Sequence, residues 1–392
     1  MKRGSASNIY LLYILKFSKW FMLFMPIIVI FFQENGLNMQ QIFILKSLNA
    51  ITVVVMEIPS GYLADRLGRR KTLLLGALLS FGGFLAYSVA HDFFMFLVAE
   101  LFIGLSMSFI SGADSAMLYD SLQSLERKND YAKQEGRITS LGNFSEAAAG
   151  ILGGFLAGIS LRLPFIAQTG IAFIGIPAAL MLWEPKINSV LQKTTMRSVF
   201  NTMRDTFLRN RILRAYILFS AFAGMTTLTL AWFIQPYFKA IDLPLKWFGV
   251  LWTSLNISVA LTALWAYKAE RLISARMMLM CISIFIGGGF ILLGFFEGVW
   301  GIIVLFLIYL VRGIATPVLK DYINRYTSSD VRATILSVRS FIIRIGFAVI
   351  SPFLGWYTDH YDLQHALIIA GSIFLFSMLT VIVVFWKSIK KS

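Results

Sequence analysis

Long apolar segments alternate with short polar ones along all 392 residues of the chain. A helix needs about 20 apolar residues to cross a bilayer. Twelve segments reach this length, near residues 9–33, 39–62, 72–91, 93–118, 135–159, 163–183, 212–236, 245–267, 275–296, 299–325, 332–356 and 364–386. There is no alternation of apolar and polar residues in ten-residue segments, as a barrel would need. The pattern predicts an all-α membrane protein with 12 transmembrane helices.

The longest polar stretch falls between the sixth and seventh predicted spans. It divides the chain into a six-helix bundle over 1–183, a cytoplasmic linker over 184–211 and a second six-helix bundle over 212–392. Composition supports a membrane protein, because 58% of the residues are hydrophobic and only 14% are charged, whereas soluble domains carry about 25% charged residues.

The positive charges predict the orientation. Of the 35 Lys and Arg residues, 26 fall in or beside the segments that are cytoplasmic if the chain starts inside, and only Arg162, Lys239 and Lys246 fall in exterior loops. This asymmetry predicts that both termini are cytoplasmic. It also explains the net charge of +15 by a basic face beside anionic lipid, so we expect no nucleic-acid partner.

A charged segment repeats in the two halves. Residues 61–72 read GYLADRLGRRKT, and residues 266–276 carry a weaker copy with Tyr, an acid, Arg and Leu at matched places. The ends of the fourth and tenth spans also match, with Gly112 and Gly313 at equivalent positions. Parallel six-span repeats are typical of transporters whose binding site lies between the two halves.

With this loop, the topology and the repeat together, the chain resembles the major facilitator superfamily over its full length. In that family the loop between spans 2 and 3 reads G-x-L-A-D-R-x-G-R-[KR]-x, and the matching residues here include Gly61, Asp65, Arg66, Gly68, Arg69 and Arg70. The resemblance implies two six-helix bundles and secondary transport by alternating access.

These loop residues are expected to form a conformational latch. Gly68 permits a tight turn, and Asp65 can accept hydrogen bonds at the start of a facing helix. The resemblance implies that this helix is span 11, which opens near Arg332. Arg66 and Arg69 can pair with acids at neighbouring helix ends, for which Asp120 is the best candidate. The alternative is that the arginines only reflect the orientation of the protein.

Two features depart from the drug/proton antiporters of the family. Their R-x-x-x-G motif in span 4 is replaced here by Glu100 followed by Gly104, and the Pro of their span 5 is absent. Gly150, Gly154 and Gly158 recur every four residues in span 5 and predict close helix packing. The antiporter subfamily is therefore left open.

Four acids lie inside predicted spans, where ionisable groups are costly and mark function. Glu146 lies nearest to mid-membrane and is the first candidate for proton coupling, followed by Glu57 and Asp114, with Glu100 as a further candidate. Carboxylates in a low-dielectric cavity can bind and release protons. The alternative is that these acids only form structural ion pairs.

Basic residues also lie inside the spans. Arg312, Arg339, Arg344 and Lys46 are candidates for a gate or for binding an anionic group of a substrate. Lys16 and Lys19 are expected to reach toward the cytoplasm along the first span.

The sequence therefore predicts a secondary active transporter that moves a small organic solute by proton-coupled efflux. One alternative is proton-coupled uptake or exchange of an anionic metabolite, and another is a channel or scaffold. No G-x-x-x-x-G-K-[ST] loop for ATP occurs, and three scattered histidines make no metal site. We expect no enzyme activity, no metal and no cofactor beyond a proton gradient, and a monomer in the bacterial cytoplasmic (inner) membrane.

Overall fold

The computed structural model describes residues 2–185, 210–296, 298–328 and 331–386, and this part of the chain is helical without strands. The helices of the first half are α1 (Lys2–Trp20), α2 (Ile28–Glu34), α3 (Met39–Leu67), α4 (Arg69–Val89), α5 (Phe93–Ile110), α6 (Ala113–Ser124), η1 (Lys128–Asp130), α7 (Tyr131–Ile159) and α8 (Leu163–Met181). Those of the second half are α10 (Arg211–Ala240), α11 (Leu245–Leu272), α12 (Ala275–Ile282), η2 (Ser283–Gly288), α13 (Gly289–Phe295), α14 (Trp300–Arg325), α15 (Arg332–His360) and α16 (Leu363–Val384). Most of the predicted linker lies outside the described residues.

The chain divides into two compact units. Unit 1 comprises Met1–Leu37, Leu48–Gln192 and Pro244–Thr253, and unit 2 comprises Asn38–Ser47, Lys193–Leu243 and Ser254–Ser392, each over its described residues. The start of α3 therefore belongs to unit 2, and the start of α11 belongs to unit 1. The bundle boundaries stated above stay a prediction.

Each predicted span corresponds to one helix or to consecutive helices, which confirms the all-α membrane fold. Among the described residues, ten helical segments are long and apolar enough to cross a membrane. The predicted spans outside these ten are α1 with α2, and α7. α1 carries Lys2, Arg3, Lys16 and Lys19, and α7 is polar over its first turns, so their mean hydropathy is low.

Two of the predicted spans are interrupted. In the first span α1 ends at Trp20, and the buried side chain of Gln168 accepts the freed backbone N–H of Leu23 through Oε1 at 3.0 Å. In the fourth span Gly112 has a φ of +82° and separates α5 from α6. Only glycine adopts this conformation without strain, so Gly112 marks the second interruption.

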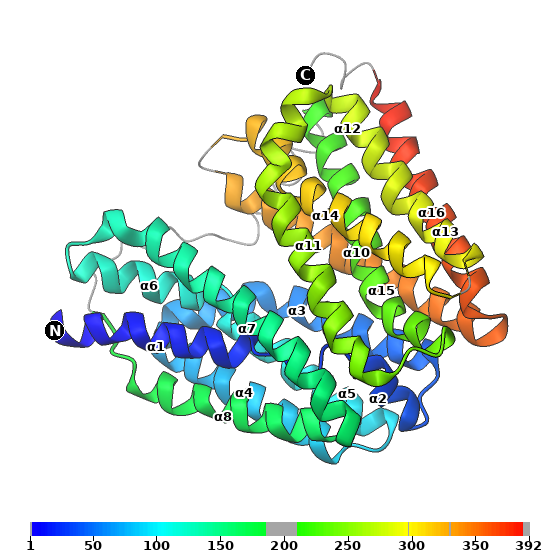
Figure 1. The fold of residues 1–392 in the computed structure, drawn as a ribbon. Helices are drawn as coiled ribbons and strands as arrows, with labels where there is room; N and C mark the ends of the chain where they lie inside the picture. The colour runs from blue at the N-terminus through cyan, green and yellow to red at the C-terminus, as the bar shows by residue number, and fades with distance from the viewer. Residues whose placement is uncertain (1, 186–209, 297, 329–330, 387–392) are drawn as a thin grey trace. The chain divides into compact units, whose positions relative to one another are not determined.

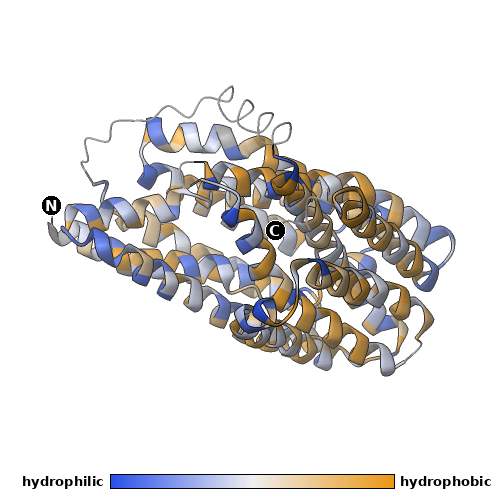
Figure 2. Ribbon diagram, turned by 90° about the horizontal axis from the view of Figure 1, so that it is seen from above, coloured by the Kyte–Doolittle hydropathy of each residue, from blue (hydrophilic) through white to orange (hydrophobic). Residues whose placement is uncertain are grey.

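The core of unit 1 lies between α1, α4, α6 and α8, which Figure 1 shows side by side. It contains Leu12, Leu73, Met117 and Leu118, each at most 3% exposed. In unit 2, α10 packs on α14, α15 and α16. Figure 2 shows hydrophobic residues along many of the helices and more hydrophilic ones near the N-terminus.

The start of α16 carries a titratable helix cap. Asp362 Oδ1 accepts the backbone N–H of His365 at 2.7 Å, and Oδ2 lies 2.7 Å from Nδ1 of the same residue. The backbone N–H of His365, with a smaller contribution from its ring, holds the pKa of the Asp362 carboxyl below its usual range. Asp362 therefore favours the folded state when it is ionised.

We expect this cap to make stability fall in acid. Because the folded-state pKa is lowered, the contribution of Asp362 is complete above the unfolded-state pKa of about 3.9 and is lost as the pH falls through the lower, folded-state value. Asp362→Asn keeps an N-cap oxygen that does not titrate. Its Tm should decline less than that of the wild type below about pH 4; parallel Tm curves would contradict this expectation.

Candidate functional site

The loop between α3 and α4 turns at Gly68. This residue has a φ of +92°, and a Cβ there would lie 3.1 Å from the Glu184 carboxylate. The turn therefore requires glycine for its backbone conformation, and a Cβ there would also crowd the Glu184 carboxylate. The predicted tight turn at Gly68 is confirmed.

Glu184, which sequence analysis did not identify, holds the start of α4. Its Oε1 accepts the backbone N–H of Arg69 at 2.9 Å, and its Oε2 accepts that of Arg70 at 2.8 Å. The first N–H groups of a helix have no partner within the helix and carry its positive dipole end. A carboxylate that binds two of these N–H groups gives them hydrogen-bond partners and places a negative charge at the positive end of the helix.

The position of Glu184 is fixed through the preceding residue, Trp183, which Asn8 holds in place. The Asn8 side chain, which is fully buried, accepts the backbone N–H of Trp183 and donates to its carbonyl oxygen, both at 2.8 Å. Asn8 also donates to Ser121 Oγ at 2.8 Å. Buried polar side chains of this kind fix helices in one register, so α1 and α6 together aim Glu184 at the loop.

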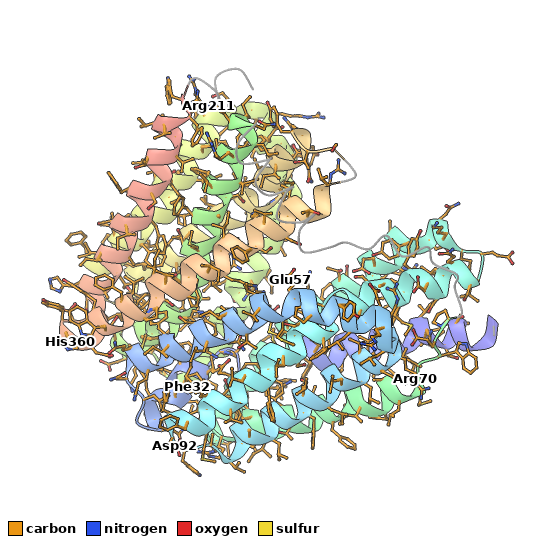
Figure 3. All side chains as sticks on the ribbon, turned by 180° about the vertical axis from the view of Figure 1, so that it is seen from behind. Phe32, Glu57, Arg70, Asp92, Arg211 and His360 are labelled. Carbon is orange, nitrogen blue, oxygen red and sulfur yellow. The ribbon has the colours of Figure 1, made fainter. Side chains whose placement is uncertain are left out.

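The arginines of the loop tie α4 to the rest of unit 1. Arg69 Nε lies 2.7 Å from Asp120 Oδ2 on α6, and Arg70 Nη2 donates to the Leu180 carbonyl at 2.6 Å. The predicted pairing of Arg69 with Asp120 is thus present. Figure 3 shows Arg70 and Asp92 at opposite ends of unit 1, so these contacts gather at one end of the unit.

Asp65 is exposed at the end of α3 and has no hydrogen bond or ion pair with another residue in the described part of the chain. Its predicted contact with the start of α15 would join the two units, and it stays a prediction. The latch roles of Gly61, Arg66 and the other loop residues likewise stay predictions.

Unit 2 has two related contacts. Glu270, in the second copy of the charged segment, pairs with Arg325 at 3.1 Å, and Arg325 also pairs with Asp321 at 2.6 Å. At the other end of the unit, Asp359 accepts the backbone N–H groups of Met39 and Gln40 at 2.9 and 2.8 Å. Like α4, α3 thus starts on a carboxylate that binds its first two N–H groups.

The predicted membrane acids lie in different surroundings. Glu100 is 2% exposed and accepts a hydrogen bond from the Tyr87 hydroxyl. Glu146 is half-buried on α7, and Glu57 is exposed on α3. The coupling roles of these acids stay predictions.

Asp114 lies in a charged cluster of unit 1. Lys16 and Lys19 at the end of α1, Asp114 and Ser115 at the start of α6, and Glu135 on α7 line one small cavity. Asp114 attracts the Lys19 ammonium, and the two lysines repel each other. α1 ends at Trp20, and both lysines line the cavity beside that end. The expectation that Lys16 and Lys19 reach toward the cytoplasm stays a prediction. Glu135 was not identified from the sequence.

The predicted membrane bases of unit 2 contact aromatic or hydroxyl groups. Arg339 donates through Nε to Ser220 Oγ, Arg312 lies 5.1 Å from the Tyr309 ring, and Lys46 lies 4.6 Å from the Trp232 ring. Arg344 is half-buried on α15. A role for these four residues in a gate or a substrate site stays a prediction.

The glycines of span 5 allow close helix packing, as predicted. A Cβ at Gly150 would lie 2.6 Å from Thr253 Oγ1, and one at Gly154 would lie 3.0 Å from the backbone of Gly249 on α11. Gly158, by contrast, has no atom within 4 Å of its Cβ position. Close packing therefore involves two of the three predicted positions.

The family model named Major Facilitator Superfamily matches residues 9–349 of this chain. The match covers most of the sequence and both units. The chain belongs to the major facilitator superfamily. It is therefore a transporter and not an enzyme.

This superfamily member is similar in sequence to bacterial drug-resistance proteins. It is 21% identical over 308 residues to the quinolone resistance protein NorA of Staphylococcus aureus (strain Mu50 / ATCC 700699), which is 77% of each chain. It is 24% identical over 161 residues to multidrug resistance protein 2 of Bacillus subtilis (strain 168), covering 41% of this chain and 38% of that protein.

Solved structures of the superfamily share its fold. The nucleoside transporter NupG superposes with a TM-score of 0.80 at 15% identity, covering 97% of this chain and 99% of NupG. A D-xylose–proton symporter superposes with a TM-score of 0.73 at 12% identity, covering 97% of each chain. At these identities the similarity shows the fold alone.

Proposed function

We propose that this superfamily member exports a small organic solute in exchange for protons by alternating access. The observation that carries the proposal is the cluster of two carboxylates and two ammonium groups in unit 1. Ionisable side chains within transmembrane segments are costly and mark proton or substrate pathways. A proton gradient is the only energy source that the proposal requires.

The relatives favour export. NorA and multidrug resistance protein 2 are named for resistance to quinolones or to many drugs. For a transporter, resistance to a drug is best explained by movement of that drug out of the cell. The proposal also includes a monomer in the bacterial cytoplasmic membrane, with both termini in the cytoplasm.

A second candidate function is proton-coupled uptake or exchange of an anionic metabolite. It is favoured by the half-buried Arg339 and Arg344 on α15, because a guanidinium is well suited to bind a carboxylate or phosphate. The two candidates differ in direction: export exchanges solute against protons, whereas uptake moves both the same way.

The test uses purified protein in proteoliposomes, with the quinolone norfloxacin as the first probe. An imposed proton gradient should drive norfloxacin against the direction of proton flow, and added norfloxacin should move protons, which a trapped pH dye reports. Empty liposomes and an ionophore that collapses the gradient are the controls. Saturable transport that ignores the proton gradient would refute proton coupling, and solute moving together with protons would refute exchange in favour of uptake.

A further inference from the structure

The charged cluster of unit 1 lies at the ends of two interrupted spans. Lys19 is in the last turn of α1, and Asp114 is in the first turn of α6. A cation at the C-terminal end of a helix and an anion at the N-terminal end are each stabilised by the helix dipole. Both interruptions therefore place a charge where its own helix favours it, as the discontinuous helices of transporters do around ions.

The cavity between these charges has room for about one water molecule. Its volume is about 10 Å³, and about 10–15 Å³ by this measure holds one water if polar partners surround it. The partners are present, because carboxylate, ammonium and hydroxyl groups all line the cavity. A single water could therefore bridge Asp114 to its neighbours.

Ser115 connects the two carboxylates. Its hydroxyl donates to Glu135 Oε1 at 3.1 Å, and its backbone N–H donates to Asp114 Oδ1 at 2.8 Å. A serine hydroxyl can donate and accept at the same time. The hydroxyl is bonded directly to Glu135, and a water in the cavity would link it to Asp114, because the backbone N–H keeps its own proton.

The two carboxylates come from different helices and meet at Ser115. Glu135 is the fifth residue of α7 and bonds to the Ser115 hydroxyl, whereas Asp114 precedes Ser115 on α6. The start of α7, about 6 Å from Glu135, is predicted to face the cytoplasm. A proton that moves between Glu135 and Asp114 thus passes from α7 to α6 across the cavity.

We infer that Glu135, Ser115 and Asp114 form a proton relay, with Lys16 and Lys19 as its countercharges. This inference rests on the proposed function and assigns its proton-binding residues. When the relay takes up a proton, Glu135 first binds it from water. The Ser115 hydroxyl then accepts this proton and releases its own. Asp114 binds the released proton through the bridging water. The reverse sequence releases the proton, and no other atom is exchanged.

The charges around the relay explain how one bound proton can affect the conformation of the protein. The titratable groups that face the two carboxylates in the described residues are Lys16 and Lys19 from α1 and Tyr131 from α7. With both acids ionised the cluster is neutral, and one added proton leaves an excess positive charge among these half-buried groups. Such a change is large enough to bias a conformational equilibrium.

This assignment differs from the first candidate of the sequence analysis. Glu146 lies on the same helix as Glu135 but about 16 Å farther along it. It does not line the cavity of the cluster. The relay therefore operates without Glu146.

The relay can be tested without knowing the solute. Infrared difference spectra of the purified protein in lipid nanodiscs, recorded as the pH is lowered, report each carboxyl that gains a proton through its C=O band. Asp114→Asn and Glu135→Gln should each remove one such band. Lys19→Met should move the Asp114 band to higher pH, because the ammonium that favours the ionised form is gone.

The matched control is Asp130→Asn, which removes a half-buried acid outside the cavity, paired with Arg127 at 2.7 Å, and should leave the assigned bands unchanged. Ser115→Ala keeps all charges, and it should keep both bands while slowing norfloxacin-driven proton movement at least tenfold in proteoliposomes. Bands that persist in Asp114→Asn and Glu135→Gln would overturn the relay. Intact bands in a protein that moves no norfloxacin or other drug against protons would refute the proposed export and leave the relay standing.

Discussion

The Gly153→Ala protein is expected to unfold at a clearly lower temperature than the wild type, at a cost of about 1–3 kcal/mol or more. A Cβ at position 153 would lie 1.9 Å from the backbone oxygen of Leu23 and 2.8 Å from its carbonyl carbon. Leu23 cannot move away freely, because its N–H is bound to Gln168. The added methyl group therefore has to displace the interrupted segment of the first span.

The control lies on the same helix. Gly158→Ala adds the same methyl group where no atom lies within 4 Å, and replacing a helical glycine by alanine is favourable by up to about 1 kcal/mol. Thermal unfolding of both variants in one detergent gives the comparison. Equal Tm changes in the two variants would mean that α7 and the first span are not packed as described.

The Glu184→Ala protein is expected to lose about 1–2 kcal/mol of stability. The substitution leaves the first two N–H groups of α4 without their carboxylate and removes an anion from the positive end of the helix. Glu184→Gln should lose less, because an amide oxygen can still accept one of the two hydrogen bonds. Chemical or thermal unfolding of the purified protein measures the difference.

Asp65→Asn is the matched control, because Asp65 makes no bond to another described residue. Its stability should stay within about 0.5 kcal/mol of the wild type. A loss of transport in Asp65→Asn without a loss of stability would support the latch predicted from the loop motif. If Asp65→Asn destabilised the protein as much as Glu184→Ala, the assignment of Glu184 as the anchor of α4 would be wrong.

The length of the apolar segments was sufficient to predict the spans, because a bilayer imposes a length that the sequence must meet. It was not sufficient to predict the interruption of the first span. Residues 21–27 are as apolar as the helices around them, and Pro26 is the only local signal. The interruption depends on Gln168, more than 140 residues away, whose side chain replaces a backbone partner.

The candidate site was predicted only in part, because some of its residues depend on local sequence and others on tertiary contacts. The loop motif identified Gly68 and the Arg69–Asp120 pair, because these residues act close to where the motif lies. Glu184 was missed because its function follows from Asn8 holding Trp183, a tertiary contact. Glu135 was missed because it lies at the predicted boundary of span 5, where a charged residue suggests only the membrane surface.

In the described part of the chain, two helices begin on a carboxylate that binds two successive N–H groups: α4 on Glu184 and α3 on Asp359. Helix starts are normally the places where a helix frays and where amide hydrogens exchange first with solvent. Here the amide hydrogens of Met39, Gln40, Arg69 and Arg70 are bound, so opening either helix start requires that a carboxylate leave as well. Fraying at these two helix starts is therefore coupled to the release of an acid on another part of the chain.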